Sequence, residues 1–461
     1  MQIAFHGADQ NVTGSCHYVE CAGKRILIDC GLYQGHRELE EENRNDFGFD
    51  PASIDFLLLT HAHLDHCGRI PLLAKRGFHG RIICTAATRE LTKLVLLDSA
   101  HIQEEDAKYR NYKASKRKSP GDPVEPLYTT VDVLSTLDLF VDIARWEKPH
   151  SLAPGIKANF YDAGHILGSA CILLDLEENG DRRTVLFSGD LGSSGRAILP
   201  DPARAPQADV VVMETTYGDR LHRNLQESIL ELYQAINTTI ERRGNVLIPS
   251  FALERSQEIL YYLREGVETS VLPQSLRVYL DSPMAISATE IFRRHPECFD
   301  EDTWQVLASG RDPFTLPGLQ FTRESADSIA LKGMEGVVIL AGSGMATGGR
   351  IRHHLRNNLW RKETSVIFVG FAAKGTLARE IIDGAEEVHI LHDSIAVNAD
   401  IHTINGFSAH ADQRELFKWH EETRAKRTFL VHGEESAMHT FAGLLKETKV
   451  EMPALNSVYT L

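Results

Sequence analysis

The chain has 461 residues, of which 43% are hydrophobic and 25% charged. This composition is ordinary for a soluble globular enzyme and excludes a disordered or fibrous protein, and the length predicts about two or three domains. The formal net charge of −15 argues against nucleic-acid binding through an overall basic surface, although it leaves room for a local basic cleft.

Short apolar runs rich in β-branched residues recur along the chain and predict strands. They lie at residues 25–29, 56–60, 81–84, 158–161, 171–176, 184–188, 210–213, 245–249, 277–280, 337–341, 366–370 and 428–431. Amphipathic patterns over residues 227–242 and 254–264 predict helices between some of these strands. The alternation predicts a layered α/β fold.

Two irregular segments interrupt this pattern. Residues 108–126 are polar, first basic and then rich in Pro and Gly, and predict a surface excursion between helices. Residues 200–207 are rich in Pro, Ala and Asp, and a second α/β series begins at Asp209. We therefore expect one domain split into residues 1–206 and 399–461, with a second domain, 207–398, inserted into it.

Cysteine usage and the N-terminus indicate the compartment. The seven cysteines are odd in number and form no C-x-x-C pair, so we expect buried reduced thiols rather than disulfides or a Cys₄ zinc site. Residues 1–10 show no basic, apolar leader, and no apolar run approaches the ~20 residues of a membrane span. The expected location is the cytoplasm, without a membrane partner.

A dense cluster of metal-ligand side chains follows the predicted strand 56–60: His61, His63, Asp65 and His66. A strand that ends in a tight loop projects such side chains into one small volume. Imidazole nitrogens and carboxylate oxygens suit zinc. Four ligands this close together fit two neighbouring ions better than one tetrahedral ion.

Further ligand candidates stand at the ends of other predicted strands. His165 follows 158–161, Asp190 follows 184–188 and His432 follows 428–431, each beside a glycine. Functional groups at the carboxyl ends of sheet strands are the common arrangement in α/β layers. We expect these three side chains to join the cluster.

Asp29, loop 61–66, His165 and Asp190 together resemble the successive motifs of the metallo-β-lactamase superfamily. The resemblance implies an αββα sandwich that binds two Zn²⁺ per chain, with Asp29 orienting the ligands. It implies that one zinc is held by His61, His63 and His165, the other by Asp65, His66 and His432, and that Asp190 bridges them.

Three later motifs resemble those of β-CASP nucleases. Val-Met-Glu-Thr-Thr-Tyr-Gly at 212–218 is similar to motif A, Gly-Phe-Ser-Ala-His-Ala-Asp at 406–412 to motif B, and Leu-Val-His-Gly-Glu at 430–434 to motif C. The resemblance implies an inserted α/β β-CASP domain, as in the nuclease subunit of the pre-mRNA 3′-end cleavage factor and its compact prokaryotic counterparts. A histidine in motif C, here His432, is typical of members that act on RNA.

The expected activity is therefore zinc-dependent hydrolysis of single-stranded RNA by an endonuclease, with exonuclease action left open. The resemblance implies catalytic roles for Asp65, Glu214 and His410, with His410 as proton donor and Glu214 orienting it. Expected substrate contacts are Arg255, Gly344, Arg350 and Ser408.

The glycine-rich segment 342–350 follows the predicted strand 337–341, so its N–H groups either cradle a phosphate or form an ordinary turn. Glu254 stands where the β-CASP signature often has glycine, which puts the local turn geometry in doubt. Residues 109–118 are a candidate for holding RNA, and a solvated charged face is the stronger alternative.

Two other functions compete with the ribonuclease. A hydrolase of small esters, thioesters or lactones shares the loop 61–66 but needs neither the insertion nor the Glu214 and His410 pair, and the charge of −15 mildly favours it. An inactive scaffold would lack ligands, and this chain has a complete set. A homodimer is left open.

Overall fold

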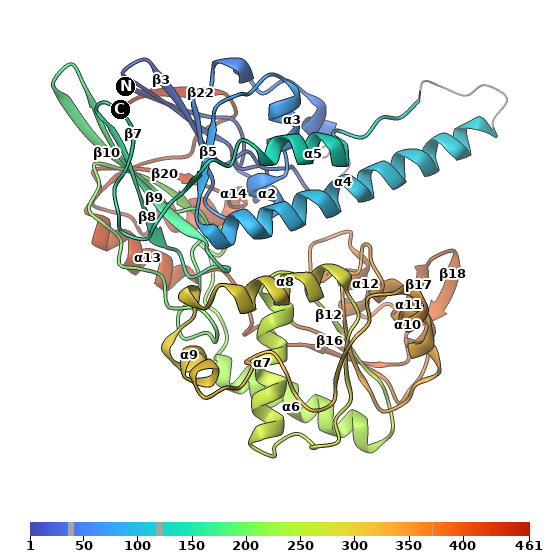
Figure 1. The fold of residues 1–461 in the computed structure, drawn as a ribbon. Helices are drawn as coiled ribbons and strands as arrows, with labels where there is room; N and C mark the ends of the chain where they lie inside the picture. The colour runs from blue at the N-terminus through green and yellow to red at the C-terminus, as the bar shows by residue number, and fades with distance from the viewer. Residues whose placement is uncertain (36–40, 117–122, 371) are drawn as a thin grey trace. The chain divides into compact units, whose positions relative to one another are not determined.

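A computed structural model describes residues 1–35, 41–116, 123–370 and 372–461 (Figure 1). The chain divides into two compact units. Unit 1 comprises Met1–Ser194, Asp201–Leu221 and His410–Leu461, and unit 2 comprises Gly195–Pro200 and His222–Ala409. Unit 1 is thus assembled from segments that lie on both sides of unit 2 in the sequence.

Sheet 1 of unit 1 has the strand order β22-β1-β2-β3-β4-β5-β6. Neighbours up to β3 pair antiparallel, and β3, β4, β5 and β6 pair parallel. The strands are β1 (Gln2–Phe5), β2 (His17–Cys21), β3 (Lys24–Ile28), β4 (Phe56–Leu58), β5 (Arg81–Cys84), β6 (Asp142–Ile143) and β22 (Ser457–Thr460).

Sheet 2 of unit 1 has the order β21-β20-β11-β10-β9-β8-β7. Antiparallel hairpins form the β7 to β10 side, whereas β10, β11, β20 and β21 run parallel. The strands are β7 (His150–Ala153), β8 (Ile156–Asp162), β9 (Ala170–Glu178), β10 (Asp181–Phe187), β11 (Val210–Glu214), β20 (Arg427–Val431) and β21 (Lys449–Glu451).

The two sheets of unit 1 pack face to face. One apolar core joins Ile3, Ile26 and Leu58 of sheet 1 to Phe160 and Val212 of sheet 2. Helices form the outer layers (Figure 1). They are α2 (Leu64–Cys67), α3 (Ile70–Lys75), α4 (Ala86–Ser115) and α5 (Thr130–Leu137) on sheet 1, and α13 (Gln413–Thr423) and α14 (Glu435–Ala442) on sheet 2. The predicted αββα sandwich is confirmed.

Unit 2 is built on a parallel sheet of order β14-β13-β15-β12-β16-β19. The strands are β12 (Val246–Pro249), β13 (Val278–Leu280), β14 (Leu319–Phe321), β15 (Val338–Ala341), β16 (Ser365–Phe368) and β19 (Asp400–Thr403), with a separate hairpin β17 (Glu387–Ile390) and β18 (Asp393–Ala396). Its helices are α6 (Leu225–Glu241), α7 (Arg255–Glu268), α8 (Pro283–Arg294), α9 (Glu301–Ala308), α10 (Ser325–Ala330), α11 (Ile351–Asn358) and α12 (Leu377–Ile382).

Local sequence explains most of these elements. Residues 210–213 of β11 are all buried, as a continuous apolar run predicts for a parallel strand covered on both faces, and Glu214 at the end of the strand is buried as well. The Thr85 side chain caps α4 by accepting a hydrogen bond from the Thr88 N–H, and Asp412 and Glu415 form a capping box on α13. None of the described helices combines the length and apolar character that crossing a bilayer requires.

The excursion predicted for residues 108–126 is wrong over its first part, because α4 continues to Ser115. The segment from Lys108 to Ser115 holds no Gly or Pro, and its Lys, Arg and Ala residues are good helix formers. Residues 117–122 lie outside the described part of the chain. The polar character of this segment marked exposure rather than the absence of a helix.

Candidate metal centre

The ligand candidates of unit 1 all follow strands at their carboxyl ends. Loop 61–66 follows β4, His165 follows β8, Asp190 follows β10 and His432 follows β20. Glu214 is the last residue of β11, which lies between β10 and β20 in sheet 2. Because β10, β11 and β20 are parallel, their carboxyl ends meet at one edge, and this topology gathers the side chains.

The first group of side chains is His61, His63, His165 and Asp190, whose ligand atoms all lie within 4.8 Å of one another. His63 Nδ1 lies 3.1 Å from His61 Nε2 and 3.2 Å from His165 Nε2. The Oδ2 atom of Asp190 lies 3.5 Å from His61 Nε2 and 3.6 Å from His165 Nε2. Nitrogen and oxygen donors therefore surround one small volume.

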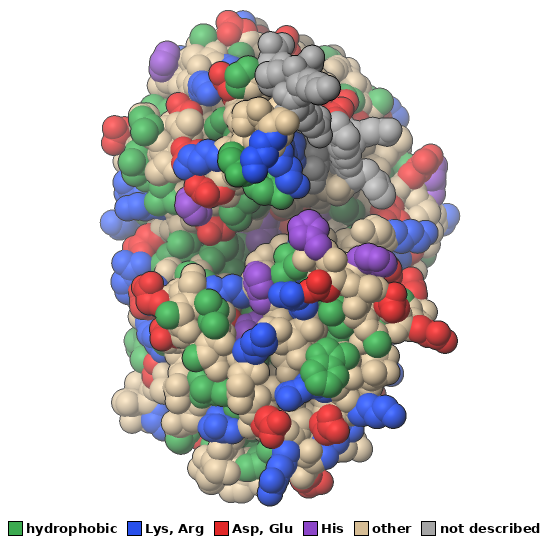
Figure 2. All heavy atoms as spheres, turned by 90° about the vertical axis from the view of Figure 1, so that its right-hand side faces the viewer, with side chains coloured by type: hydrophobic (Ala, Val, Ile, Leu, Met, Phe, Trp, Pro, Cys, Tyr) green, Lys and Arg blue, Asp and Glu red, His purple; other side chains and the backbone are tan. Residues whose placement is uncertain are grey.

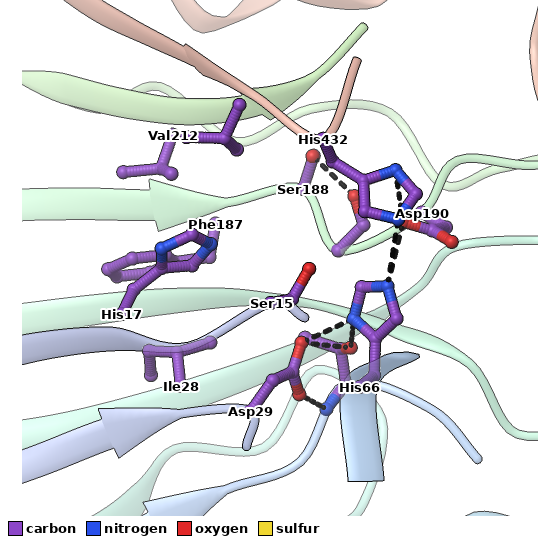
Figure 3. Close-up of a pocket in the computed structure, with 13 residues that line it drawn as sticks. Ser15, His17, Ile28, Asp29, His66, Phe187, Ser188, Asp190, Val212 and His432 are labelled. Atoms are coloured by element: carbon purple, nitrogen blue, oxygen red, sulfur yellow. Dashed lines mark hydrogen bonds and ion pairs between the residues drawn. The ribbon is translucent and has the colours of Figure 1, made fainter. Parts of the chain in front are cut away.

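The second group is Asp65, His66 and His432. His432 Nε2 lies 3.3 Å from His66 Nε2 and 3.4 Å from Asp65 Oδ2. The Oδ1 atom of Asp190 lies 3.3 Å from His66 Nε2 and 3.5 Å from His432 Nδ1. Figure 3 shows the His66 and His432 rings facing one another with Asp190 beside them. One oxygen of Asp190 thus faces each group, as a bridging carboxylate does.

The donor set fits a pair of divalent cations. Asp190 Oδ1 is buried and has no hydrogen-bond partner in the part of the chain that the structure describes. Burial lowers the pKa of His61, and it lowers that of His63 to about 4, which leaves imidazole lone pairs available. Burial also lowers the pKa of His66, but the charges of Asp190 and Asp29 outweigh it and hold that pKa well above its usual value. The carboxylates of Asp190 and Asp29 thus place negative charge around the histidines, and bound cations would balance that charge.

Residues behind the ligand candidates fix the orientation of these side chains. Asp29 Oδ2 lies 2.7 Å from His66 Nδ1, and its carboxylate also accepts hydrogen bonds from the N–H and hydroxyl of Thr60 (Figure 3). Thr216 Oγ1 lies 3.0 Å from His432 Nδ1. Thr60 and Thr216 are not among the predicted site residues. The signal was their position, directly before loop 61–66 and inside motif A.

A His–Glu pair lies beside the ligands. His410 Nδ1 is 3.2 Å from Glu214 Oε1 and 4.0 Å from Asp190 Oδ2. Burial lowers the pKa of His410, but the charge and hydrogen bond of Glu214 outweigh it and raise the pKa to about 9. The Leu191 N–H donates to Glu214 Oε1 at 2.7 Å, which fixes the carboxylate. The histidine is thus held protonated at neutral pH, at the edge of the cluster.

Two glycines allow the ligand loops to approach one another. Gly192 pairs with His410 in an antiparallel bridge, and its N–H donates to the Ala163 carbonyl. A Cβ at Gly192 would lie 1.9 Å from the carbonyl oxygen of Gly164, the residue before His165. A Cβ at Gly31 would lie 1.6 Å from the carbonyl oxygen of Asp65. No side chain fits at either position without moving a ligand loop.

Three family models match the chain: the metallo-beta-lactamase superfamily over residues 10–235, the Beta-Casp domain over 256–381, and the Zn-dependent metallo-hydrolase RNA specificity domain over 394–455. The chain is 38% identical over 448 residues to "Ribonuclease TTHA0252" of Thermus thermophilus, covering 96% of each protein. The chain belongs to the β-CASP family of the metallo-β-lactamase superfamily.

Other β-CASP relatives are more distant. "Transcription termination factor FttA" of Methanocaldococcus jannaschii is 31% identical, covering 97% of this chain and 69% of that protein. The "RNase J-like protein" of the same organism is 28% identical, covering 97% and 96%. The solved structure of a protein of unknown function from Enterococcus faecalis V583 aligns with a TM-score of 0.56 over 100% of this chain and 99% of that one, and its 12% identity shows the fold alone.

The four predicted substrate contacts of this β-CASP chain all belong to unit 2. Arg255 is buried and forms an ion pair with Glu258. A Cβ at Gly344 would lie 2.8 Å from the Phe251 ring, and Ser408 is half-buried. Arg350 donates from Nη1 to Asp281 Oδ1 at 2.7 Å and to the Thr322 carbonyl at 2.8 Å. Contact with substrate stays a prediction for all four.

Asp281 is a further residue that sequence analysis missed. It is fully buried in unit 2, and its carboxylate binds the side chains of Arg350, His354, Thr322 and Ser328. Burial raises the pKa of Asp281, but these hydrogen bonds outweigh it and hold the pKa well below its usual value. The carboxylate therefore stays ionised and anchors Arg350 at the start of α11, directly after the glycine-rich segment.

Proposed function

We propose that this chain is a zinc-dependent ribonuclease that hydrolyses phosphodiester bonds within single-stranded RNA, with two Zn²⁺ per chain. The observation that carries the proposal is the carboxylate of Asp190 between two groups of histidines, with the ion pair of His410 and Glu214 beside it. The names of the relatives, a ribonuclease at 38% identity among them, support RNA as the substrate.

The proposed ligand sets follow the two groups of donors. One zinc is held by His61, His63, His165 and Asp190, and the other by Asp65, His66, His432 and Asp190. Apart from the shared Asp190, each ion would have three protein donors, the number that leaves a catalytic zinc open to water or a phosphate oxygen. When bound, two zinc ions activate a water molecule and balance the charge that develops on the phosphate.

The residues of the chain carry the proton transfer. His410 holds a proton because Glu214 lies 3.2 Å from its Nδ1. With Nδ1 held by Glu214, the imidazolium of His410 donates its Nε2 proton to the 3′ oxygen that leaves as the phosphodiester bond breaks, and the products are a 3′-hydroxyl and a 5′-phosphate. Glu214 positions the imidazole, and it is itself held by the N–H groups of Leu191 and Thr216. Asp65 contributes as a ligand beside His432.

Unit 2 supplies the remaining contacts to RNA in this proposal. The glycine-rich segment 342–350 presents N–H groups to a phosphate, with Gly344 allowing close approach. Arg350 is largely engaged by Asp281 and Thr322, so it positions the segment more than it binds substrate. Arg255 is engaged in the same way by Glu258, so Ser408 remains the proposed side-chain contact.

The test uses metal-replete protein and four substrates: end-labelled single-stranded RNA, single-stranded DNA of the same sequence, a lactone and a thioester. We expect internal RNA fragments that carry 5′-phosphates, and little or no turnover of the other three. Terminal products alone would replace the endonuclease with an exonuclease. Turnover of only the small substrates would overturn the proposal in favour of a small-molecule hydrolase.

A further inference from the structure

The C-terminal half of α4, from about residue 101 to Ser115, has a surface that takes no part in the proposed metal centre. One side of this part of the helix is bound by residues 124–127, which lie further along the chain. Asn111 exchanges two hydrogen bonds with the backbone of Val124, at 2.9 and 2.8 Å, and Gln103 Oε1 accepts the Leu127 N–H. These bonds fix which side of the helix faces the rest of unit 1.

The opposite side presents large side chains to solvent. Ile102, Tyr109 and Tyr112 are 56%, 52% and 59% exposed. Their spacing places them on one side of the helix, away from Gln103 and Asn111. Figure 1 shows that this half of α4 extends past the strands of sheet 1, and in Figure 2 Lys or Arg and hydrophobic side chains lie together on the face toward which it points. Exposed tyrosines at adjacent turns of one helix form a candidate binding surface.

Two lysines accompany the tyrosines. Lys113 Nζ lies 4.5 Å from the centre of the Tyr109 ring, and Lys116 Nζ lies 4.2 Å from that of Tyr112. Neither lysine forms an ion pair with a carboxylate of the described chain, whereas Lys108 is paired with Glu105. Residues 107–116 contain no Asp or Glu. This end of the helix is therefore positively charged in a protein of net charge −15.

We propose that this surface of α4, made by Tyr109, Tyr112, Lys113 and Lys116, is a second binding site for single-stranded RNA. The tyrosines stack on bases and the lysines contact phosphates, the combination that sequence-independent single-strand binding uses. The proposal rests on the proposed ribonuclease function. A protein partner fits less well, because lysine is depleted from the cores of protein interfaces.

The helix also sets the distance from the metal centre. Its N-cap, Thr85, donates from Oγ1 to the carbonyl oxygen of Gly168, in the loop that carries His165, at 2.7 Å. Tyr109 comes 23 residues after Ala86, which places it about 35 Å along the helix axis. A strand that binds both places must be long. A short oligonucleotide that fills only the metal centre does not reach Tyr109.

The experiment measures cleavage of two RNA substrates by the full-length protein. The short RNA has about 6 nucleotides, within the site size of a single binding fold, and the long RNA has on the order of 40 nucleotides. The variants are Tyr109→Ser with Tyr112→Ser, and Lys113→Gln with Lys116→Gln. We expect each pair to raise KM about 10-fold for the long RNA and to leave kcat, and both constants for the short RNA, unchanged. Circular dichroism checks that α4 stays folded.

Matched controls separate this site from general effects. Lys148→Gln with Lys157→Gln removes the same charge from exposed positions elsewhere on unit 1 and should leave KM unchanged. Tyr109→Phe with Tyr112→Phe keeps the aromatic rings and should bind long RNA like the parent chain. Loss of both lysines should also reduce the salt dependence of long-RNA binding, lowering the slope of log K against log salt by about 1.4.

Equal long-RNA affinity in the parent and in both variant pairs would overturn the proposal. The proposal would also be overturned if the variants lost self-association in sedimentation but kept RNA binding, because the surface would then bind a second copy of the chain. Affinity is also measured by fluorescence anisotropy without cleavage. A parent chain that cleaves neither RNA therefore counts against the proposed function, while the binding comparison still decides the role of α4.

Discussion

The Nδ1 atom of His410 lies 3.2 Å from Glu214 Oε1, and the same oxygen accepts the Leu191 N–H at 2.7 Å. Leu191 follows Asp190, which stands between the two groups of histidines. The backbone of the residue after Asp190 thus bonds to the carboxylate that holds His410. His410 lies within reach of the cluster, yet its Nδ1 faces Glu214.

We therefore expect His410→Ala to lower kcat for RNA by about 100-fold to 10 000-fold, the usual worth of a general acid, without lowering the zinc content. Elemental analysis and single-turnover cleavage measure the two effects. Glu214→Gln should lower kcat in the same direction, because the histidine loses the charge that keeps it protonated. Loss of a zinc ion from the His410→Ala protein would make His410 a ligand instead.

Thr216→Val tests the orientation of His432. The substitution keeps the shape of the side chain and removes the hydroxyl that lies 3.0 Å from His432 Nδ1. We expect zinc affinity at the second ligand group to fall about 10-fold to 100-fold, measured by competition with a chelating dye. His63→Ala is the comparison, because it removes a donor and should lower the zinc content outright. Unchanged affinity in the valine variant would show that the hydroxyl plays no part in orientation.

Gly192→Ala tests the close approach of two ligand loops. An added Cβ would lie 1.9 Å from the Gly164 carbonyl oxygen, so the loops that carry His165 and Asp190 must separate. We expect the unfolding free energy to fall by about 1–3 kcal/mol and the zinc content to fall with it. The control is Gly333→Ala, where an added Cβ meets no described atom within 4 Å. A fully metal-loaded Gly192→Ala protein would contradict this prediction.

Glu254 has a backbone φ of 62° and ψ of −59°, which a side chain strains and glycine adopts freely. The position at which β-CASP signatures often carry glycine thus keeps a glycine-like backbone in this chain. We expect Glu254→Gly to raise the unfolding free energy by about 1 kcal/mol, measured by urea unfolding. Glu265→Gly, inside the helix α7 that Glu254 precedes, should lower the unfolding free energy by about 1 kcal/mol. A lower unfolding free energy in both variants would show that the contacts of the Glu254 side chain stabilise the fold by more than the backbone strain costs.

His420 on α13 predicts a dependence of stability on pH. Burial lowers its pKa from 6.5 to about 4, and its Nε2 lies 2.7 Å from Thr428 Oγ1. Between these two pKa values the unfolded chain binds a proton that the folded chain excludes, so stability falls as the pH drops from 6.5 to 4. The loss is at most about 3 kcal/mol. In His420→Gln the unfolding free energy should decrease less between pH 7 and pH 4.5. Parallel curves for the two proteins would exclude this role for His420.

Local patterns in the sequence were enough to predict the layers and to select the clustered side chains. Apolar runs mark β4, β10, β11 and β20, and short motifs at their ends hold the residues that the structure brings together. The domain limits at residues 206 and 398 and the individual ligand roles stay predictions. Local patterns therefore predict those side chains whose position is set by residues next to them in the sequence.

Residues defined by distant partners escaped prediction. Asp281 follows a short strand like many surface carboxylates, and its meaning comes from Arg350 and His354, about 70 positions later. The hydroxyl of Thr60 bonds to Asp29, which follows β3, and that of Thr216 lies beside His432, which follows β20. The helix over residues 108–115 was missed because its polar residues resemble a loop when the hydrogen bonds of Asn111 to Val124 are unknown.

Strand β20 pairs with β11 in sheet 2, although the long segment His222–Ala409 of unit 2 separates the two strands in the sequence. His432, at the end of β20, is thus the last of the clustered donors to be synthesised. A chain growing on the ribosome has every other donor long before this one, and until residue 432 emerges the second group holds only Asp65 and His66. In the proposed two-metal centre, the second group would therefore be completed only after the segment His222–Ala409 of unit 2 has been synthesised.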